Sequence, residues 1–356
     1  MGRPVLLVAR GLDPVGSGGE LELVATGLAA AGLPVAFAAT TTGGSLPERL
    51  AARGIGVHRL GARPVVDASS VARLAGLARR LRPAAILGFG RSQAWPVMIA
   101  RRCTAGSRGM LRLGLPPARV RQAWPLRRLD RLLVTSRAVA HDCRCAGVAE
   151  GRIEIVPPGV ATPAAPRLDR SDLAARLGLD PACRWTVAVA PLEPTSHLDR
   201  LVWAIDQLGV VRKDLQHVLV GAGPLLHGIQ RRARAQELAE RLFIVPHSGL
   251  LPELVAHAAI VWQSGDVALG GCLLDGMARG LPAVAVESEA ARQLIADGET
   301  GRIVPPVPES EFPRRVFGIL EDDALAARCG AAAAARAADG FSAERLVKAV
   351  ITALAS

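Results

Sequence analysis

The sequence predicts an α/β protein made of two doubly wound parallel sheets in tandem, each with helices on both faces. Three observations support this prediction. The chain has 356 residues, which is long for one domain and sufficient for two that each bury a core. Short apolar runs alternate with helical patterns, as in parallel βαβ units. The alternation stops once, near residues 157–166, and then restarts.

The first half contains six apolar runs that we expect to be strands, at residues 5–9, 34–39, 56–59, 84–87, 132–135 and 153–156. Helical patterns occupy residues 20–31, 45–53, 70–81 and 136–146. Residues 91–131 look shortened and irregular. The stretch 157–166 is rich in Pro and Ala, and both periodicities end there. We therefore expect a first domain over residues 1–160 and a linker over residues 161–183.

The second half repeats the pattern, with strands expected at residues 185–190, 216–220, 241–244, 259–262, 283–286 and 301–304. Helices are expected at residues 198–208, 225–239, 251–258, 273–279 and 290–297, and residues 322–356 are helical with a break near 339–340. This predicts a second domain over residues 184–338 and a C-terminal helix over residues 339–356. Two such sheets leave a central cleft between their carboxyl edges, where ligands bind in folds of this class.

The positive charge is concentrated in the N-terminal part of the chain. The net charge is +11, and residues 1–165 carry 23 Arg against 9 Asp and Glu. Such asymmetry points to an anionic partner, namely a membrane surface or an acidic glycan. An alternative of equal weight is that these arginines are simply solvated, because the chain uses Arg in place of Lys almost everywhere and contains Lys only at Lys213 and Lys348. A nucleic-acid partner is not expected, because aromatic residues are only 3% of the chain and the sequence shows no aromatic side chains placed for bases to stack on.

The most basic segment, residues 119–131, combines arginines with Trp124 and leucines, which suits an anionic membrane face. An ordinary amphipathic helix is the alternative that Pro125 favours. The six cysteines form no CxxC pair, and His141 and Cys145 have no second pair with which to hold a metal. Residues 4–8 are interpreted as a strand rather than a signal peptide, and no apolar run approaches the roughly 20 residues of a membrane span. We expect a cytoplasmic protein that is either free or peripheral on the inner membrane face.

Six segments, in order, resemble family 4 of the glycosyltransferases. They are Gly-Ser-Gly-Gly-Glu at 16–20, Ile-Val-Pro-Pro-Gly-Val at 155–160, Val-Gly-Ala-Gly-Pro at 220–224, Leu-Asp-Gly-Met-Ala-Arg-Gly-Leu-Pro at 274–282, Asp-Gly-Glu-Thr-Gly at 297–301, and Phe341-Ser342. The resemblance implies the GT-B fold, with a C-terminal helix that crosses back to the N-terminal domain. It also implies a retaining transferase that uses a nucleoside-diphosphate sugar and needs no metal or other cofactor.

The resemblance further implies a nucleotide- and phosphate-binding site formed by Gly18, Gly19, Ser196, His197, Gly270, Gly271 and Asp275. Glycine-rich turns that open helices offer free backbone amides and the positive end of a helix dipole to phosphate groups. Asp275 is expected to accept hydrogen bonds from ribose hydroxyls. Its alternative role is to stabilise the dipole of its own helix.

The chain departs from the family at the positions that usually carry catalysis. Pro191 stands where the family has an Arg, Ser196 where it has a Lys, and Val267 where it has the first of two glutamates. Asp266 is a neighbour that could replace that glutamate, and residues 86–131 contain no His for the sugar. The catalytic residues are therefore not assigned.

Two hypotheses follow: an active glycosyltransferase, or a catalytically inactive scaffold that serves as a partner, regulator or sugar-nucleotide sensor. A dehydrogenase is set aside, because the glycine fingerprint after the first strand is incomplete.

Overall fold

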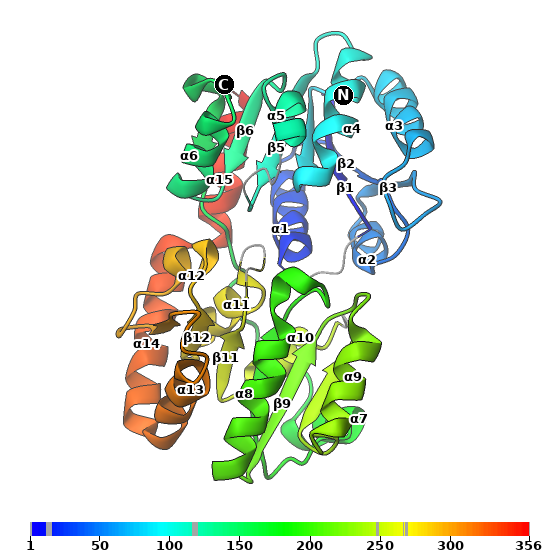
Figure 1. Cartoon of the computed structure of the whole chain (residues 1–356). Helices are drawn as coiled ribbons and strands as arrows, with labels where there is room; N and C mark the ends of the chain where they lie inside the picture. The colour runs from blue at the N-terminus through cyan, green and yellow to red at the C-terminus, as the bar shows by residue number, and fades with distance from the viewer. Residues whose placement is uncertain are drawn as a thin grey trace. The chain divides into compact units, whose positions relative to one another are not determined.

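The computed structural model describes residues 2–11, 16–115, 120–246, 249–265, 267 and 270–355. The chain divides into two compact units, Met1–Gly159 with Ala343–Ser356, and Val160–Ser342. Each unit contains one parallel sheet flanked by helices (Figure 1). This arrangement confirms the predicted fold class of two doubly wound α/β domains.

The first unit is built on a seven-stranded sheet in the order β3-β2-β1-β4-β5-β6-β7. Its strands are β1 (Val5–Ala9), β2 (Val35–Ala39), β3 (Gly56–Arg59), β4 (Ala85–Phe89), β5 (Arg108–Leu113), β6 (Arg131–Val134) and β7 (Ile153–Ile155). Its helices are α1 (Ser17–Ala30), α2 (Leu46–Ala52), α3 (Ala68–Leu81), α4 (Ala94–Arg102), α5 (Val120–Leu126), α6 (Arg137–Cys145) and α15 (Ala343–Ala355). The strand order reverses between β1 and β4, which is the switch point of this sheet.

The C-terminal helix α15 belongs to the first unit. Alternate residues of β1 face opposite sides of the sheet, so that Leu6 packs in one core and Leu7 packs in the other, together with α1 and α15. The α1 and α15 backbones approach closely, because a Cβ at Gly27 would lie 2.4 Å from a methyl group of Val347. The prediction that the last helix crosses back to the N-terminal domain is confirmed.

The second unit is built on a six-stranded parallel sheet in the order β10-β9-β8-β11-β12-β13. Its strands are β8 (Arg184–Val189), β9 (Leu215–Val220), β10 (Leu242–Val245), β11 (Ile260–Gln263), β12 (Ala283–Val286) and β13 (Gly301–Val304). Its helices are α7 (Arg170–Leu177), α8 (Leu198–Val211), α9 (Leu226–Ala235), α10 (Leu251–His257), α11 (Leu273–Ala278), α12 (Glu289–Leu294), α13 (Glu311–Glu321) and α14 (Asp323–Gly340). Here the switch point lies between β8 and β11.

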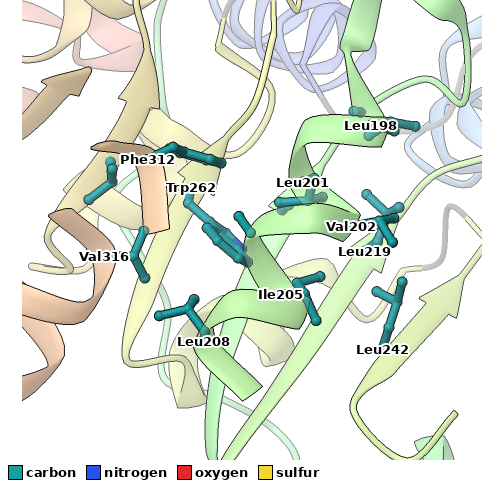
Figure 2. Close-up of a cluster of buried hydrophobic side chains, with 14 of the residues drawn as sticks. Leu198, Leu201, Val202, Ile205, Leu208, Leu219, Leu242, Trp262, Phe312 and Val316 are labelled. Atoms are coloured by element: carbon teal, nitrogen blue, oxygen red, sulfur yellow. The ribbon is translucent and has the colours of Figure 1, made fainter. Parts of the chain in front are cut away.

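A core between the second sheet and helices α8, α9 and α13 anchors the elements of this unit (Figure 2). Leu201 and Ile205 of α8 belong to the same buried cluster as Trp262 of β11, whose indole stacks on Phe312 of α13 with ring centroids 5.4 Å apart. Full burial of each such side chain contributes roughly 1.5–3 kcal/mol. The apolar face of α8 therefore fixes how its first turn meets the ends of β8 and β11.

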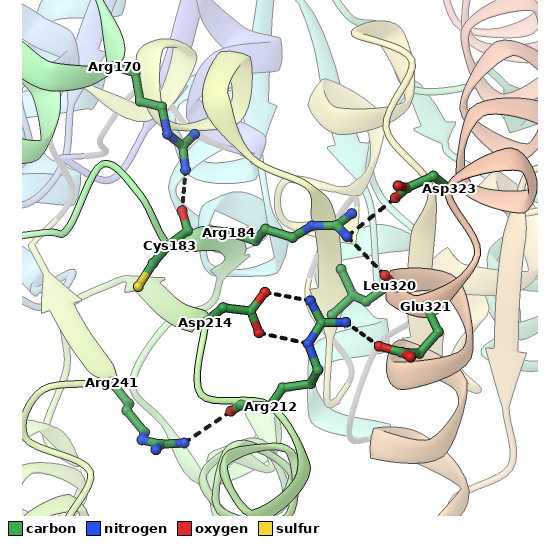
Figure 3. Close-up of polar contacts among 9 residues, drawn as sticks. All are labelled: Arg170, Cys183, Arg184, Arg212, Asp214, Arg241, Leu320, Glu321 and Asp323. Carbon is green, nitrogen blue, oxygen red and sulfur yellow. Dashed lines mark hydrogen bonds and ion pairs between the residues drawn. The ribbon is translucent and has the colours of Figure 1, made fainter.

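Ion pairs hold the opposite, amino edge of the second sheet (Figure 3). Arg184 at the start of β8 pairs with Asp323 at 3.3 Å, and the Arg212 Nε atom donates to Asp214 at 2.7 Å while the same guanidinium pairs with Glu321. These contacts tie the α13–α14 junction to the strands. Stabilising charge thus gathers at the amino edge, away from the carboxyl edge where ligands bind.

The structure differs from the sequence predictions in two segments. The region 91–131, which looked irregular, contains α4, α5 and the interior strand β5. The pattern hid β5 because its Arg112 is buried by pairing with Glu20, although arginine normally marks an exposed position. Residues 161–183, assigned to a linker, belong to the second unit and include α7.

The break that the sequence predicts near residues 339–340 coincides with the end of α14. Within the described ranges, no helix combines the length and the apolar character that a bilayer crossing requires.

Candidate functional site

The candidate site in the second unit lies where the chain leaves the carboxyl ends of β8 and β11. These strands are neighbours in the sheet but distant in the sequence, so the chain leaves their carboxyl ends toward opposite sides of the sheet. Ligands bind at such a switch point in folds of this class, and we call this place, where the two loops leave the sheet, the crevice. The loop after β8 spans residues 190–197 and leads into α8. The loop after β11 carries Ser264, Gly265, Gly270 and Gly271 and leads into α11. The two loops thus bring Ser196 close to the glycines.

Close backbone contacts hold the two loops together. A Cβ at Gly271 would lie 2.4 Å from the Val189 carbonyl oxygen, and one at Gly265 would lie 2.6 Å from the Ser196 carbonyl carbon. Gly271 also has a φ of 58° and Gly270 a φ of 75°, a region that side chains rarely adopt. Glycine is therefore required at residue 271 by the fold itself, whether or not a phosphate binds there.

Ser196 is engaged within its own loop. It is fully buried, its hydroxyl donates to the Pro191 carbonyl oxygen at 2.6 Å, and its carbonyl accepts from the Ser264 hydroxyl at 3.0 Å. The hydroxyl proton is consequently not free for a phosphate oxygen in this conformation. His197 follows with a φ of 47° and lines a separate groove of about 400 Å³ between α8 and α9, together with Leu198, Val202 and Ile229.

Asp275 lies in the first turn of α11, one turn beyond Gly271. Burial raises the pKa of its carboxyl to about 6, although a backbone hydrogen bond and the charge of Arg279 act in the opposite direction. The residue keeps some accessible surface. Asp275 is thus an ionisable acceptor at neutral pH and a neutral donor in mild acid, a property typical of functional sites.

Val267 occupies the position where the resemblance implies a glutamate. Its side chain is 6% exposed and packs into the hydrophobic core of the second unit. An apolar residue satisfies this position, so Val267 has a structural role and no polar chemistry. Asp266, the neighbour that could replace the glutamate, lies outside the described residues.

Sequence reasoning missed Arg200, on the first turn of α8. Its Nη1 atom donates to the Ser264 carbonyl oxygen at 3.1 Å, so the guanidinium reaches the loop after β11. The available signal was a basic residue four positions after Ser196, at the start of an otherwise apolar helix. Spacing alone did not predict that its side chain reaches the neighbouring loop.

In the first unit, Gly18 and Gly19 form the first turn of α1, after the switch-point strand β1. The helix begins at Ser17, its N-cap residue Gly16 has a φ of 51°, and no side chain in the described part of the chain caps it. The next residue, Glu20, forms a buried bidentate pair with Arg112, with distances of 3.1 Å from Nε and 2.6 Å from Nη2. Arg112 also donates to the Val156 carbonyl oxygen, which ties the start of α1 to the end of β7.

Two family models match consecutive parts of the chain. The model described as Glycosyltransferase Family 4 matches residues 21–163, and the model described as Glycosyl transferases group 1 matches residues 170–336. Together they cover most of both units. The first matched range ends at residue 163 and the second begins at residue 170, both shortly after Val160, where the second unit begins.

Curated relatives share moderate sequence identity with part of the chain. A D-inositol 3-phosphate glycosyltransferase of Nocardia farcinica is 29% identical over 208 residues, covering 55% of this chain and 46% of the relative. A GDP-mannose-dependent alpha-(1-6)-phosphatidylinositol monomannoside mannosyltransferase of Mycolicibacterium smegmatis is 32% identical over 194 residues, covering 51% and 50%. The chain spans about half the length of the curated relatives it matches.

Solved structures resemble the chain over its full length. Anabaena HepE in complex with UDP and glucose matches with a TM-score of 0.86 at 17% identity, covering 100% of both chains. Sucrose-phosphate synthase of Thermosynechococcus elongatus matches with a TM-score of 0.80 at 18% identity, covering 99% and 98%. At these sequence identities the structural similarity establishes the fold, and the two family-model matches establish the family. The chain is a member of family 4 of the glycosyltransferases and has the GT-B fold.

Proposed function

We propose that the chain binds a nucleoside-diphosphate sugar at the carboxyl edge of its second sheet and transfers the sugar, with retention, to an acceptor. The observation that carries the proposal is the switch point between β8 and β11, where the loops that follow the two strands meet and Asp275 lies one turn beyond Gly271. Nucleotide sugars also fit the relatives, since the mannosyltransferase is named for GDP-mannose and the HepE structure holds UDP and glucose. The sugar, the base and the acceptor are open, and no metal or other cofactor is part of the proposal.

Each residue of the site has a defined task in this proposal. In the second unit the Gly271 amide donates to a phosphate oxygen, and the Gly270 amide does so when it leaves the Val267 carbonyl oxygen, to which it donates at 3.0 Å in this structure. In the first unit Gly18 and Gly19, in the first turn of α1, are proposed to donate to phosphate in the same way. Asp275 accepts hydrogen bonds from ribose hydroxyls when it is ionised. Since burial raises the pKa of Asp275 to about 6, nucleotide affinity should fall as the pH drops below that value.

Calorimetric titration with UDP, GDP, ADP and their sugar conjugates tests the proposal. We expect one of these series to bind, and Asp275→Asn to weaken that binding roughly tenfold or more through loss of a charged acceptor. Asp172→Asn on the exposed face of α7 is the matched control and should bind as the unmodified chain does. Absence of binding across the panel, with a folded protein, would refute the proposal.

The alternative function is a sugar-nucleotide sensor or regulatory scaffold without catalysis. It is favoured by the side chains at residues 191, 196 and 267, because Pro191 has no charge, Ser196 is engaged and Val267 is packed in the core. Release of nucleoside diphosphate from bound donor, with and without candidate acceptors, separates the two functions. Binding without any release indicates the sensor. Pro191→Arg should then raise donor affinity, whereas Ser196→Lys would force an ammonium into a fully buried position.

We also propose that the first unit contacts an anionic membrane face from the cytoplasmic side. Trp95 and Trp124 stack with centroids 4.8 Å apart and are 47% and 38% exposed, and the Arg128 guanidinium lies 3.7 Å from the Trp124 ring centroid. Exposed indoles beside arginine suit the interface of anionic lipid.

Co-sedimentation with vesicles tests the membrane contact. Vesicles of phosphatidylglycerol should retain the protein, phosphatidylcholine vesicles should not, and Trp95→Ala should weaken retention. Binding to a soluble acidic glycan but not to vesicles would replace the membrane with a glycan partner.

A further inference from the structure

The loop after β8 offers no fixed positive charge to a phosphate group. Residues 190–197 contain no Arg or Lys, and Pro191 and Ser196 occupy the two positions where the resemblance implies cations. A diphosphate that approached this crevice would meet backbone amides but little compensating charge from this loop. A fixed positive charge at this place must therefore come from a neighbouring element.

Arg200 is such a cation. It lies on the first turn of α8, off the apolar face formed by Leu198, Leu201 and Val202, which points into the core in Figure 2. Because that face is fixed by packing, the Arg200 side chain projects along the flank of the helix. Its Nη1 atom donates to the Ser264 carbonyl oxygen at 3.1 Å, at the carboxyl end of β11. The guanidinium therefore reaches the crevice from the helix rather than from the loop.

The hydrogen bonding of Arg200 is incomplete. Its Nε atom is buried and has no hydrogen-bond partner among the described residues. Other arginines use more of their nitrogens: the buried Arg112 pairs with Glu20 through two, and the part-buried Arg170 donates to the Pro181, Cys183 and His257 carbonyl oxygens through all three. A buried guanidinium N–H without an acceptor is unfavourable, and in native structures it calls for an explanation, such as a functional role or a bound water or ion.

We propose that Arg200 is a phosphate-binding residue of this chain, whose guanidinium pairs with the diphosphate of the donor at the crevice between β8 and β11. The inference rests on the proposed function for the nature of the ligand. Arginine suits this task because its planar fork can keep the Ser264 contact with one nitrogen and offer others to a phosphate oxygen. Charge missing from the loop is thus supplied by the helix that follows it.

Titration with inorganic pyrophosphate, UDP and uridine tests the assignment in Arg200→Gln and in the unmodified chain. We expect Arg200→Gln to lower the affinity for pyrophosphate and UDP by roughly ten- to a hundredfold, the usual effect of one charge-assisted contact. Uridine has no phosphate, so its binding should not change. Arg231→Gln, which removes the same charge from an exposed position on α9, should leave all three affinities unchanged.

Each result distinguishes this inference from the proposed function. Equal UDP affinity in the unmodified chain and in Arg200→Gln would overturn the assignment and leave the proposed function standing. Pyrophosphate binding that depends on Arg200, without binding of any nucleoside diphosphate, would keep the assignment and refute the proposed function. A folded chain that binds neither probe would overturn both. If Arg200→Gln does not fold, Arg200→Lys replaces it in the test, since lysine keeps the charge but lacks the Nε–H donor. Arg200→Lys should bind pyrophosphate and UDP several-fold more weakly than the unmodified chain, and unchanged affinity would count against the assignment.

Discussion

The buried His217 should make the stability of the second unit depend on pH. His217 lies on β9 and is 1% exposed, with its Nδ1 atom 2.8 Å from the Thr186 hydroxyl oxygen. Its Nε2 atom has no hydrogen-bond partner among the described residues, and its ring packs 5.3 Å from that of Trp262. Burial, and secondarily the charge of Arg241, lowers the pKa of His217 to about 3. The imidazole of the folded protein is therefore neutral at neutral and mildly acidic pH.

The size of the effect follows from the two pKa values. In the unfolded chain the pKa is 6.5, so between pH 6.5 and pH 3 the unfolded state binds a proton that the folded state does not. The free energy of unfolding then falls by about 1.4 kcal/mol for each pH unit of acidification. The contribution of His217 is fully present above pH 6.5, decreases by about 3 kcal/mol at pH 4, and by about 5 kcal/mol at pH 3 as an upper bound.

Urea unfolding of His217→Asn from pH 7 to pH 4 measures this contribution. The asparagine amide can keep the Thr186 hydrogen bond but does not titrate. The buried Trp185 and Trp262 report the transition of the second unit by fluorescence. The variant should be less stable at pH 7 by about 1–2 kcal/mol because of its smaller volume, and more stable than the unmodified chain below about pH 5.

His227→Asn, on the exposed part of α9, is the control and should follow the unmodified chain at every pH. The reasoning is refuted if the difference in unfolding free energy between His217→Asn and the unmodified chain stays constant from pH 7 to pH 4.

Three further predictions use the same measurement. Asp275→Asn should stabilise the ligand-free second unit by at most about 3 kcal/mol above pH 6, because the raised pKa makes ionisation of Asp275 costly only in the folded state. This gain in unfolding free energy should vanish below pH 3.8, and a gain independent of pH would contradict the prediction. Arg112→Met should destabilise the first unit by about 3 kcal/mol by leaving Glu20 buried and unpaired, and adding Glu20→Leu should recover most of the loss. Gly271→Ala should cost at least about 1 kcal/mol, because its Cβ would overlap the Val189 carbonyl oxygen at a φ of 58°; unchanged stability would mean that the loops can move apart.

The sheets could be predicted from the sequence because parallel strands buried on both faces are continuous apolar runs. β1 (Val5–Ala9) and β12 (Ala283–Val286) contain only apolar residues, and neither requires information from distant parts of the chain. The end of α14 at Gly340 was similarly local, since glycine favours helix ends. The family resemblance then supplied the place of the last helix, which local patterns do not contain.

What the sequence did not predict depends on partners that are distant in the chain. β5 was hidden because Arg112 looks like a surface residue until Glu20, 92 positions earlier, is placed against it. Arg200 and Ser264 are 64 positions apart, and only the neighbouring positions of β8 and β11 bring them together. The raised pKa of Asp275 is likewise a result of burial, which no spacing rule reveals.

At the candidate site, some residues are required by the fold, whereas others would be required only for binding a ligand. Gly265 and Gly271 are required by close backbone packing, so their presence does not distinguish an active enzyme from an inactive scaffold. Asp275 and Arg200 are different, because a carboxyl with a raised pKa and a buried guanidinium nitrogen without a partner both reduce stability. A scaffold that had lost its ligand would gain stability by replacing either one. Their presence together at one crevice therefore weighs toward a chain that still binds an anionic, ribose-containing ligand, even though the loop after β8 has no Arg or Lys.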